Sequence, residues 1–472
     1  MKPEDVLEKV CRSIDILVNA SERHEGLFPS LLDLTTHEML PELPSAIDGQ
    51  RNGDRSHQGS NLIHDQAVLK TMYALSKALD REEYARAADR YIRRFAIHCT
   101  DTVTGLFPWG EHAFWHLIED KIGNGALLSN PSSRGGAIHD HLRQAPVWLW
   151  EKLYEYNPGC VERFAEGLDY HWKDGEPLEY SRHAHIEAET RPDRGDRSCD
   201  FPRHGGFYIL DWSFAYIKSG RTDFLQQIHR MVDYWWPKRD GEGLLLIESR
   251  SPEDEDRFYN VNAPGQTLSL ATSLLESAML LDEKQPELAA KMRQRATVYI
   301  NGFLVAPHDL EKGIFVLACK RDTHTLVDAM PIWGSKYGLW PASYVALTAL
   351  CAYRMTGDEG LLRWSESVGH CYLREPFPPN VAVPAMDSGL GLSLLADLYD
   401  LTGEALWIDG GWRLAGKLIR IYLDGDLPRG AAGIDWYESQ MGSSFLLHGL
   451  ARMALLSIER NHCPLEADYT AR

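Results

Sequence analysis

Apolar residues recur at helical spacing along most of the chain. Val68, Met72, Leu75 and Leu79 lie three or four positions apart, as on one face of an α-helix, and a more charged helix follows the turn at 80–81. This unit of an apolar helix, a short polar turn and an amphipathic helix recurs, so the sequence predicts six helical hairpins. The first helices are expected near residues 63–79, 141–156, 205–218, 266–281, 338–355 and 389–401.

The more apolar helix of each hairpin is expected in an inner ring and the more charged helix in an outer ring. An apolar helix near 440–459 has no partner after it, and a helix near 4–19 has none before it. Pairing these two helices would close the ring with a seventh hairpin. The sequence therefore predicts an all-α fold, an (α/α)6–7 toroid, as a single domain over residues 1–472.

Long connections lead from each outer helix to the next inner helix. In such a ring they all emerge on one face, together with the N-termini of the inner helices, whose unpaired N–H groups favour an anionic ligand. Because loops of this size in a compact domain are usually functional, the site is expected on this face. The connections are expected at about 98–140, 172–204, 238–265, 305–337, 371–388 and 422–439.

The charge and hydropathy of the chain exclude several classes of partner. A formal net charge of -19 argues against nucleic acid, which needs a basic surface. No apolar run reaches the roughly 18 residues that a membrane-spanning helix needs, so no membrane partner is expected. The first residues alternate charged and apolar side chains and lack the continuous apolar core of a signal peptide, which predicts a cytoplasmic location.

The expected loops gather histidine, arginine and aromatic residues. Aromatic rings on a ligand-binding face stack on sugars, although they could also pack beneath the loops. Asp140 could be a simple helix cap, and His141 and Arg143 are expected on the first turn of the helix that follows it. The candidate catalytic residues are Glu111, Asp140, Arg203, His204 and Tyr259. The candidate substrate-binding residues are His112, Trp115, His139, His141, Arg143, Arg182, His183, Arg257, Asn260, His324, Trp333, Tyr337 and Trp436.

No cofactor and no metal are expected from the motifs. The pairs His139-x-His141 and His183-x-His185 have neither the spacing of a zinc-protease helix nor that of a zinc finger. Phosphate-loop and dinucleotide motifs are absent, since Gly205-Gly206 follows no strand and lacks a third glycine.

Loops of this composition suit a carbohydrate ligand. Two classes of enzyme could account for them. A glycoside hydrolase needs two carboxylates at a fixed separation, for which Glu111 with Asp140 or Asp435 is a candidate pair. A uronate lyase instead neutralises the sugar carboxylate and abstracts the neighbouring proton, using groups such as arginine, histidine and tyrosine. The excess of these residues in the loops favours the lyase.

Three loop motifs carry a resemblance to a known family. HDHLRQAP (139–146), SRHA (181–184) and FPRHGGFYI (201–209) resemble bacterial relatives of the alginate and glucuronan lyases of polysaccharide lyase family 38. The resemblance implies a toroid of seven hairpins, cleavage by β-elimination and a histidine–tyrosine catalytic pair. Carried over by position, His204 would be the catalytic or carboxylate-neutralising histidine, and Tyr259 the proton-transferring tyrosine.

The leading hypothesis is a lyase acting on a uronate-containing oligo- or polysaccharide, with Arg203, Arg182 and His183 binding carboxylates. The second is a glycoside hydrolase of the same fold, acting on uronosyl or galactosyl linkages. A sugar epimerase using two histidines and an inert glycan-binding toroid remain further alternatives.

Overall fold

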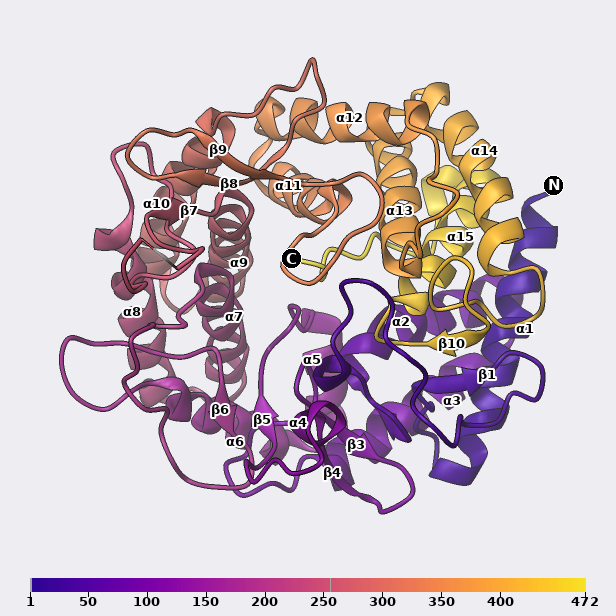
Figure 1. The fold of residues 1–472 in the computed structure, drawn as a ribbon, viewed down its shortest axis with the longest axis horizontal. Helices are drawn as coiled ribbons and strands as arrows, with labels where there is room; N and C mark the ends of the chain where they lie inside the picture. The colour runs from indigo at the N-terminus through magenta and orange to yellow at the C-terminus, as the bar shows by residue number, and fades with distance from the viewer. Residues whose placement is uncertain (1, 255) are drawn as a thin grey trace.

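The computed structural model describes residues 2–254 and 256–472. Its helices form a closed ring in which the chain alternates between an inner and an outer helix (Figure 1). The pairs, inner helix first, are α2 (Leu62–Leu79) with α3 (Glu82–Arg94), α5 (Val147–Tyr156) with α6 (Pro158–Gly167), α7 (Pro202–Ser219) with α8 (Thr222–Trp235), α9 (Pro264–Leu281) with α10 (Pro286–Val305), α11 (Ala342–Thr356) with α12 (Glu359–Arg374), and α13 (Ala385–Thr402) with α14 (Ala405–Tyr422).

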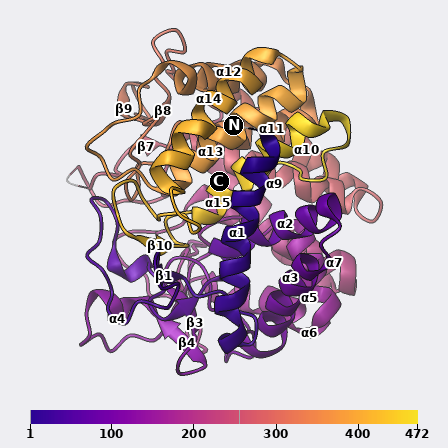
Figure 2. The same cartoon turned by 90° about the vertical axis from the view of Figure 1, so that its right-hand side faces the viewer.

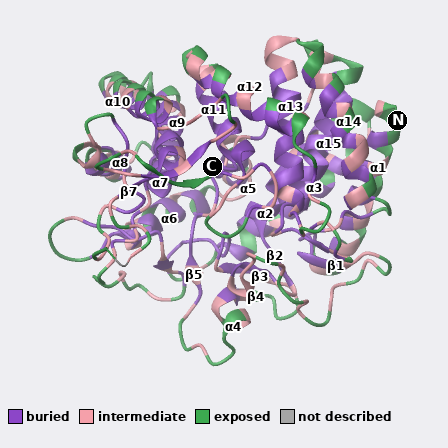
Figure 3. Ribbon diagram, turned by 45° about the horizontal axis from the view of Figure 1, so that its top comes forward, coloured by how far each residue is buried: buried purple, intermediate pink, exposed green. Residues whose placement is uncertain are grey.

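The two ends of the chain close the ring as expected. The inner helix α15 (Ser443–Ile458) packs against α13, against α2 and against the N-terminal helix α1 (Pro3–Ser21). Nearly all of α15 is buried, whereas α1 buries one apolar face that includes Val6, Val10 and Ile14. Figure 3 shows the same contrast between buried inner helices and partly exposed outer ones. The predicted all-α toroid is therefore confirmed.

Prolines set the starts of several inner helices, and this corrects two sequence predictions. Pro146 precedes α5, so residues 141–146 remain outside the helix and His141 and Arg143 are not on its first turn. Pro202 is the first residue of α7, so Arg203 and His204 lie in the first helical turn instead of ending the loop before it. The fixed φ of proline suits the first helical position and disfavours helix in the residue before it.

Short strands, which the sequence analysis did not predict, order the long loops. They form four small antiparallel sheets, in the orders β1-β10, β2-β3-β4, β5-β6 and β7-β8-β9. A short helix, α4 (Gly125–Ser129), follows β4. The strands are β1 (Leu31–Asp33), β2 (Gly59–Ser60), β3 (Ala113–His116), β4 (Lys121–Asn124), β5 (Ile138–His139), β6 (Ala184–His185), β7 (Val261–Asn262), β8 (Val316–Lys320), β9 (Leu326–Ala329) and β10 (Trp436–Glu438).

The sheets and long loops gather on one side of the ring (Figure 2). One continuous apolar cluster runs through the ring and includes residues from Val6 on α1 to Ala471 at the chain end. The last residues run into the centre of the ring (Figure 1), where the carbonyl of Thr470 accepts the backbone N–H of Gln144 at 3.2 Å. None of the helices in the described residues is long and apolar enough to cross a lipid bilayer.

Candidate active site

A cavity of about 540 Å³ opens at the loop face of the ring. Its walls come from segments far apart in the chain, between residues 47 and 441. Seven of the lining side chains are cationic and four are acidic, so the cavity is locally positive in a chain of net charge -19. A cavity with an excess of positive charge attracts an anionic ligand. The cations are Arg51, Arg143, Arg182, Arg197, Arg203, Arg257 and Lys336.

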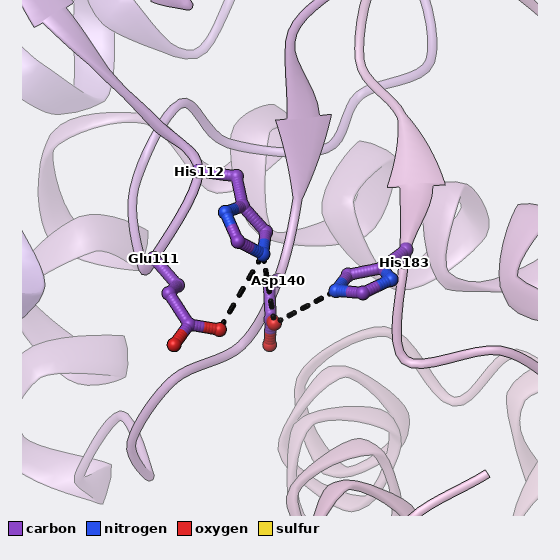
Figure 4. A group of neighbouring side chains, drawn as sticks. All are labelled: Glu111, His112, Asp140 and His183. Carbon is purple, nitrogen blue, oxygen red and sulfur yellow. Dashed lines mark ion pairs between the residues drawn. The ribbon is translucent and has the colours of Figure 1, made fainter. Parts of the chain in front are cut away.

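A cluster of two carboxylates and two imidazoles reaches one wall of this cavity, which Glu111 and His183 line, whereas His112 and Asp140 are not among the lining residues. Glu111, His112, Asp140 and His183 each offer one ligand atom, and these atoms lie within 4.8 Å of one another. Nε2 of His112 is 3.4 Å from Glu111 and 3.8 Å from Asp140, and Nε2 of His183 is 3.3 Å from Asp140. Figure 4 shows both rings directed toward the Asp140 carboxylate.

Backbone pairing between distant loops assembles the cluster. In the β5–β6 ladder, His139 pairs with Ala184, which places Asp140 and His183 side by side. A parallel bridge joins Gly110 to Asp140 and brings Glu111 next to them. The side chain of Asn61 holds this turn by donating to the Gly110 carbonyl at 2.9 Å.

Arg182 is the main cation of the cluster. Its Nη1 donates to Glu111 at 2.9 Å and also to Asp140, and its Nη2 donates to the Tyr337 hydroxyl at 3.2 Å. Burial would raise the pKa of Asp140, but the charge of Arg182 and the hydrogen bond from His204 hold that pKa well below its usual range. Asp140 is therefore ionised at neutral pH.

The two imidazoles of the cluster are neutral at neutral pH. Burial, aided by the charge of Arg182, lowers the pKa of His183 to about 4, and burial also lowers the pKa of His112. Neutral imidazole and ionised carboxylate are the forms that bind a metal ion. Nε2 of His183 is buried without a hydrogen-bond partner, and a ligand spread of 4.8 Å is close to that around one ion. The four residues therefore fit a divalent cation.

The nearby side chains of α7 support the cluster from below. Nε2 of His204 lies 3.0 Å from Asp140, and His204 is completely buried. Arg203 lines the cavity with its guanidinium 4.1 Å from the ring centroid of Trp340.

Several residues expected to bind substrate belong to the core beneath the site. His139 accepts from Trp109 at 3.2 Å and bonds to His171 at 2.9 Å. His141 bonds to Asp211 at 2.7 Å, and Trp115 is buried. Burial lowers the pKa of His139 well below its usual range, so the ring is neutral at neutral pH. Both ring nitrogens of His139 already have hydrogen-bond partners within the protein.

Other candidates lie outside the cavity lining. These residues are Tyr259, Asn260, His324, Trp333 and Trp436. Tyr259 is 38% exposed, and His324 lies beside Asp240 and Glu242. Trp333 packs on Tyr372 and Phe377. Glu111, Arg143, Arg182, His183, Arg203, Arg257 and Tyr337 do line the cavity.

The connection between α1 and α2 supplies site residues that the sequence analysis missed. Arg51 bonds to Asp54 at 2.7 Å and to Glu111 at 3.1 Å, and its guanidinium lies 3.4 Å from the Tyr337 ring centroid. Burial and the charge of Glu111 raise the pKa of Asp54 to about 7. This connection is as long as the connections on which the site was expected. Its length is therefore the feature of the sequence that could have pointed to these residues.

A family model described as "Periplasmic pectate lyase" matches residues 45–202. The matched third of the chain contains Arg51, Glu111, His112, Asp140, Arg182 and His183. The match confirms the expected enzyme class, a polysaccharide lyase, but does not bear out family 38 or its alginate and glucuronan substrates. The cytoplasmic location predicted from the sequence is wrong by this comparison, because the matched family is described as periplasmic.

Solved structures of carbohydrate-active enzymes share similarity over most of the chain. An unsaturated glucuronyl hydrolase from Bacillus sp. GL1 is 11% identical, with 99% of each chain covered and a TM-score of 0.47. A cellobiose 2-epimerase from Bacillus thermoamylovorans is 10% identical, covering 95% of this chain and 99% of that chain at a TM-score of 0.47. No curated protein matches the chain.

Proposed function

We propose that the protein is a polysaccharide lyase that cleaves a uronate glycan by β-elimination, with pectate as the first candidate substrate. The observation that carries the proposal is the cluster of Glu111, His112, Asp140 and His183, which reaches the wall of an arginine-rich cavity. The cluster lies entirely within the segment that matches the pectate lyase family.

The cluster residues would hold a divalent cation. Two carboxylates and two imidazoles suit ions such as Mn²⁺, Fe²⁺ or Zn²⁺. When bound, the cation supplies positive charge that offsets the two protein carboxylates and neutralises the carboxylate of the sugar, which makes the neighbouring C5 proton more acidic. His204 holds the Asp140 carboxylate in place from the buried side.

Tyr337 is the group we assign to proton transfer. Its hydroxyl accepts from Arg182, and Arg51 lies over its ring. Burial and then the charge of Glu111 raise its pKa, while Arg182 and Arg51 act in the opposite direction. Arg182 and Arg51, which oppose this rise, stabilise the phenolate that would accept the C5 proton. The C4–O4 bond breaks as the C4–C5 double bond forms. The leaving oxygen takes a proton from solvent water, and Tyr337 then releases the proton from C5 to solvent.

The remaining walls of the cavity suit a polyuronate. Arginines can bind sugar carboxylates in bidentate fashion, and the rings of Trp340 and Tyr344 can stack on sugar faces. A neutral glycan would leave this positive lining without partners.

The test is incubation of the full chain with polygalacturonate, alginate and glucuronan, followed by ultraviolet absorbance and mass spectrometry. We expect unsaturated products from polygalacturonate, loss of their formation with a chelator, and recovery when a divalent transition metal is restored. Saturated products, heavier by one water, would overturn the lyase.

Saturated products would instead support the glycoside hydrolase. One observation favours that second candidate: Glu111 and Asp140 share Nη1 of Arg182, so the two carboxylates are close together. Asp435 is exposed outside the cavity lining and has no place in such a pair. In a hydrolase, Glu111→Gln would abolish activity while His204→Ala would keep it.

A further inference from the structure

We infer that Arg143 and Arg203 form a second carboxylate-binding subsite in the cavity, for a uronosyl unit other than the one that faces the Glu111, His112, Asp140 and His183 cluster. This inference rests on the proposed function for the nature of the ligand. Two buried guanidinium groups without carboxylate partners carry it.

Arg143 is 4% exposed and lines the cavity. Its Nη2 donates to the Met386 sulfur at 3.1 Å, and its Nη1 is buried without any hydrogen-bond partner. Its guanidinium also lies 4.9 Å from the ring centroid of Phe445. The group therefore rests on apolar and weakly polar neighbours that do not satisfy its donors.

Arg203 is also a buried guanidinium group with few hydrogen-bond partners. It is 6% exposed, its Nη1 donates to the Tyr344 hydroxyl at 3.3 Å, and its Nε is buried without a partner. Trp340, on which the guanidinium stacks, is itself stacked on Tyr344 with ring centroids 5.0 Å apart.

Other buried arginines of the described chain have carboxylate partners inside the protein. Arg55 pairs with Glu438 at 2.6 Å, and Arg452 pairs with Asp397 at 2.8 Å. Among the described residues, no carboxylate oxygen lies within 4.0 Å of Arg143 or Arg203. A buried cation without an anion is strongly unfavourable, which indicates that the missing anion is a ligand.

The surroundings indicate which anion this is. Burial lowers the pKa of Arg143, and the charge of Arg203 acts in the same direction, so the two guanidinium groups repel each other when no anion is bound. Tyr344 and Asp468 oppose this effect without reversing it. A carboxylate would accept the free N–H groups, and Trp340 and Tyr344 offer aromatic faces to the sugar ring that carries it. Gln266, whose buried Oε1 also lacks a partner, lines the same cavity and can bond to a sugar hydroxyl.

Arg143→Met and Arg203→Met test the subsite, because methionine removes the charge and keeps much of the side-chain volume. Calorimetry with trigalacturonate, in buffer free of divalent cations, would measure binding by the full chain. We expect each variant to weaken the Kd about tenfold or more, as for loss of a hydrogen bond to a charged group. Binding of the neutral trisaccharide galactotriose should change far less. The lysine variants keep the charge without the bidentate geometry and should lie between.

The melting temperature of the ligand-free protein separates this role from a structural one. Removing an uncompensated buried charge should raise the Tm in Arg143→Met and Arg203→Met. The control is Arg452→Met, which breaks an internal ion pair and should lower the Tm while leaving the Kd unchanged. An unchanged Kd in both test variants, or a lowered Tm in both, would overturn the subsite. Trigalacturonate binding without unsaturated products would overturn the proposed lyase and leave the subsite standing.

Discussion

His204 and Asp140 face each other at 3.0 Å from Nε2 to Oδ1, and neither side chain is exposed to solvent. The other carboxylate oxygen of Asp140 faces His183 at 3.3 Å and His112 at 3.8 Å. His204 therefore fixes the direction in which Asp140 presents its second oxygen. This geometry supports a positioning role for His204, in place of the direct catalytic role expected from the sequence.

Replacing His204 by alanine should weaken the cation site without removing any of its four residues. Loss of a hydrogen bond that orients a metal ligand typically costs about 10–100-fold in metal affinity or activity. We expect the cation concentration for half-maximal activity to rise by that factor, and His204→Asn to recover part of the loss through its amide donor. The exposed His98 offers a control, since His98→Ala leaves the cluster untouched. An unchanged cation requirement in His204→Ala would contradict the positioning role.

Tyr337→Phe removes one hydroxyl and keeps the ring beneath Arg51. Because general acid–base groups contribute about 10²–10⁴-fold to rates, we expect kcat to fall by at least about 100-fold with little change in KM. Steady-state formation of unsaturated product measures both constants. The opposite pattern, an active Tyr337→Phe and an inactive Tyr259→Phe, would return the role to the tyrosine expected from the sequence.

The toroid was predictable because it follows from local patterns. Periodic apolar residues define the helices, and their alternating polarity separates the inner and outer rings. The starts of α5 and α7 were misplaced because apolar periodicity does not mark the ends of a helix, whereas Pro146 and Pro202 do.

The site was less predictable because it depends on contacts between distant loops. His139, Asp140 and His141 alternate sides in an extended segment, so Asp140 joins the cluster with Glu111, His112 and His183 while both histidines enter the core. The sequence identifies all three as polar residues near a helix. It does not show which of them faces the cluster and which faces the core. Gly110 pairs with Asp140, and β5 pairs with β6, across long stretches of chain. No local sequence pattern predicts either pairing.

Asp54 should make stability depend on pH. Its pKa is raised from 3.8 to about 7, first by burial and then by Glu111, so the folded protein holds a proton that the unfolded chain releases. This contribution is complete below the unfolded pKa and is lost as the pH rises to about 7, with a limiting slope of about 1.4 kcal/mol per pH unit for one proton. Asp54→Asn should flatten the fall in the free energy of unfolding over that range. Urea unfolding of both proteins without divalent cations measures this, and parallel curves would contradict it.

Gly110→Ala should separate Glu111 from Asp140. Gly110 has a φ of 92°, and a Cβ there would lie 1.8 Å from the Asp140 carbonyl oxygen, so the bridge between the two segments could not persist. The strain of positive φ alone costs about 1–2 kcal/mol for a residue other than glycine. Denaturant unfolding should therefore show a larger loss of stability than this strain, and the cation requirement should rise.

Gly433→Ala is the control, because it measures the cost of positive φ alone in the same experiment. Gly433 has a φ of 81° and no heavy atom within 4 Å of a built Cβ, so its replacement introduces the strain without the collision. The excess destabilisation of Gly110→Ala over Gly433→Ala then measures the contact between Gly110 and Asp140. Equal destabilisation with unchanged cation affinity in both variants would mean that the Gly110–Asp140 bridge does not organise the cluster.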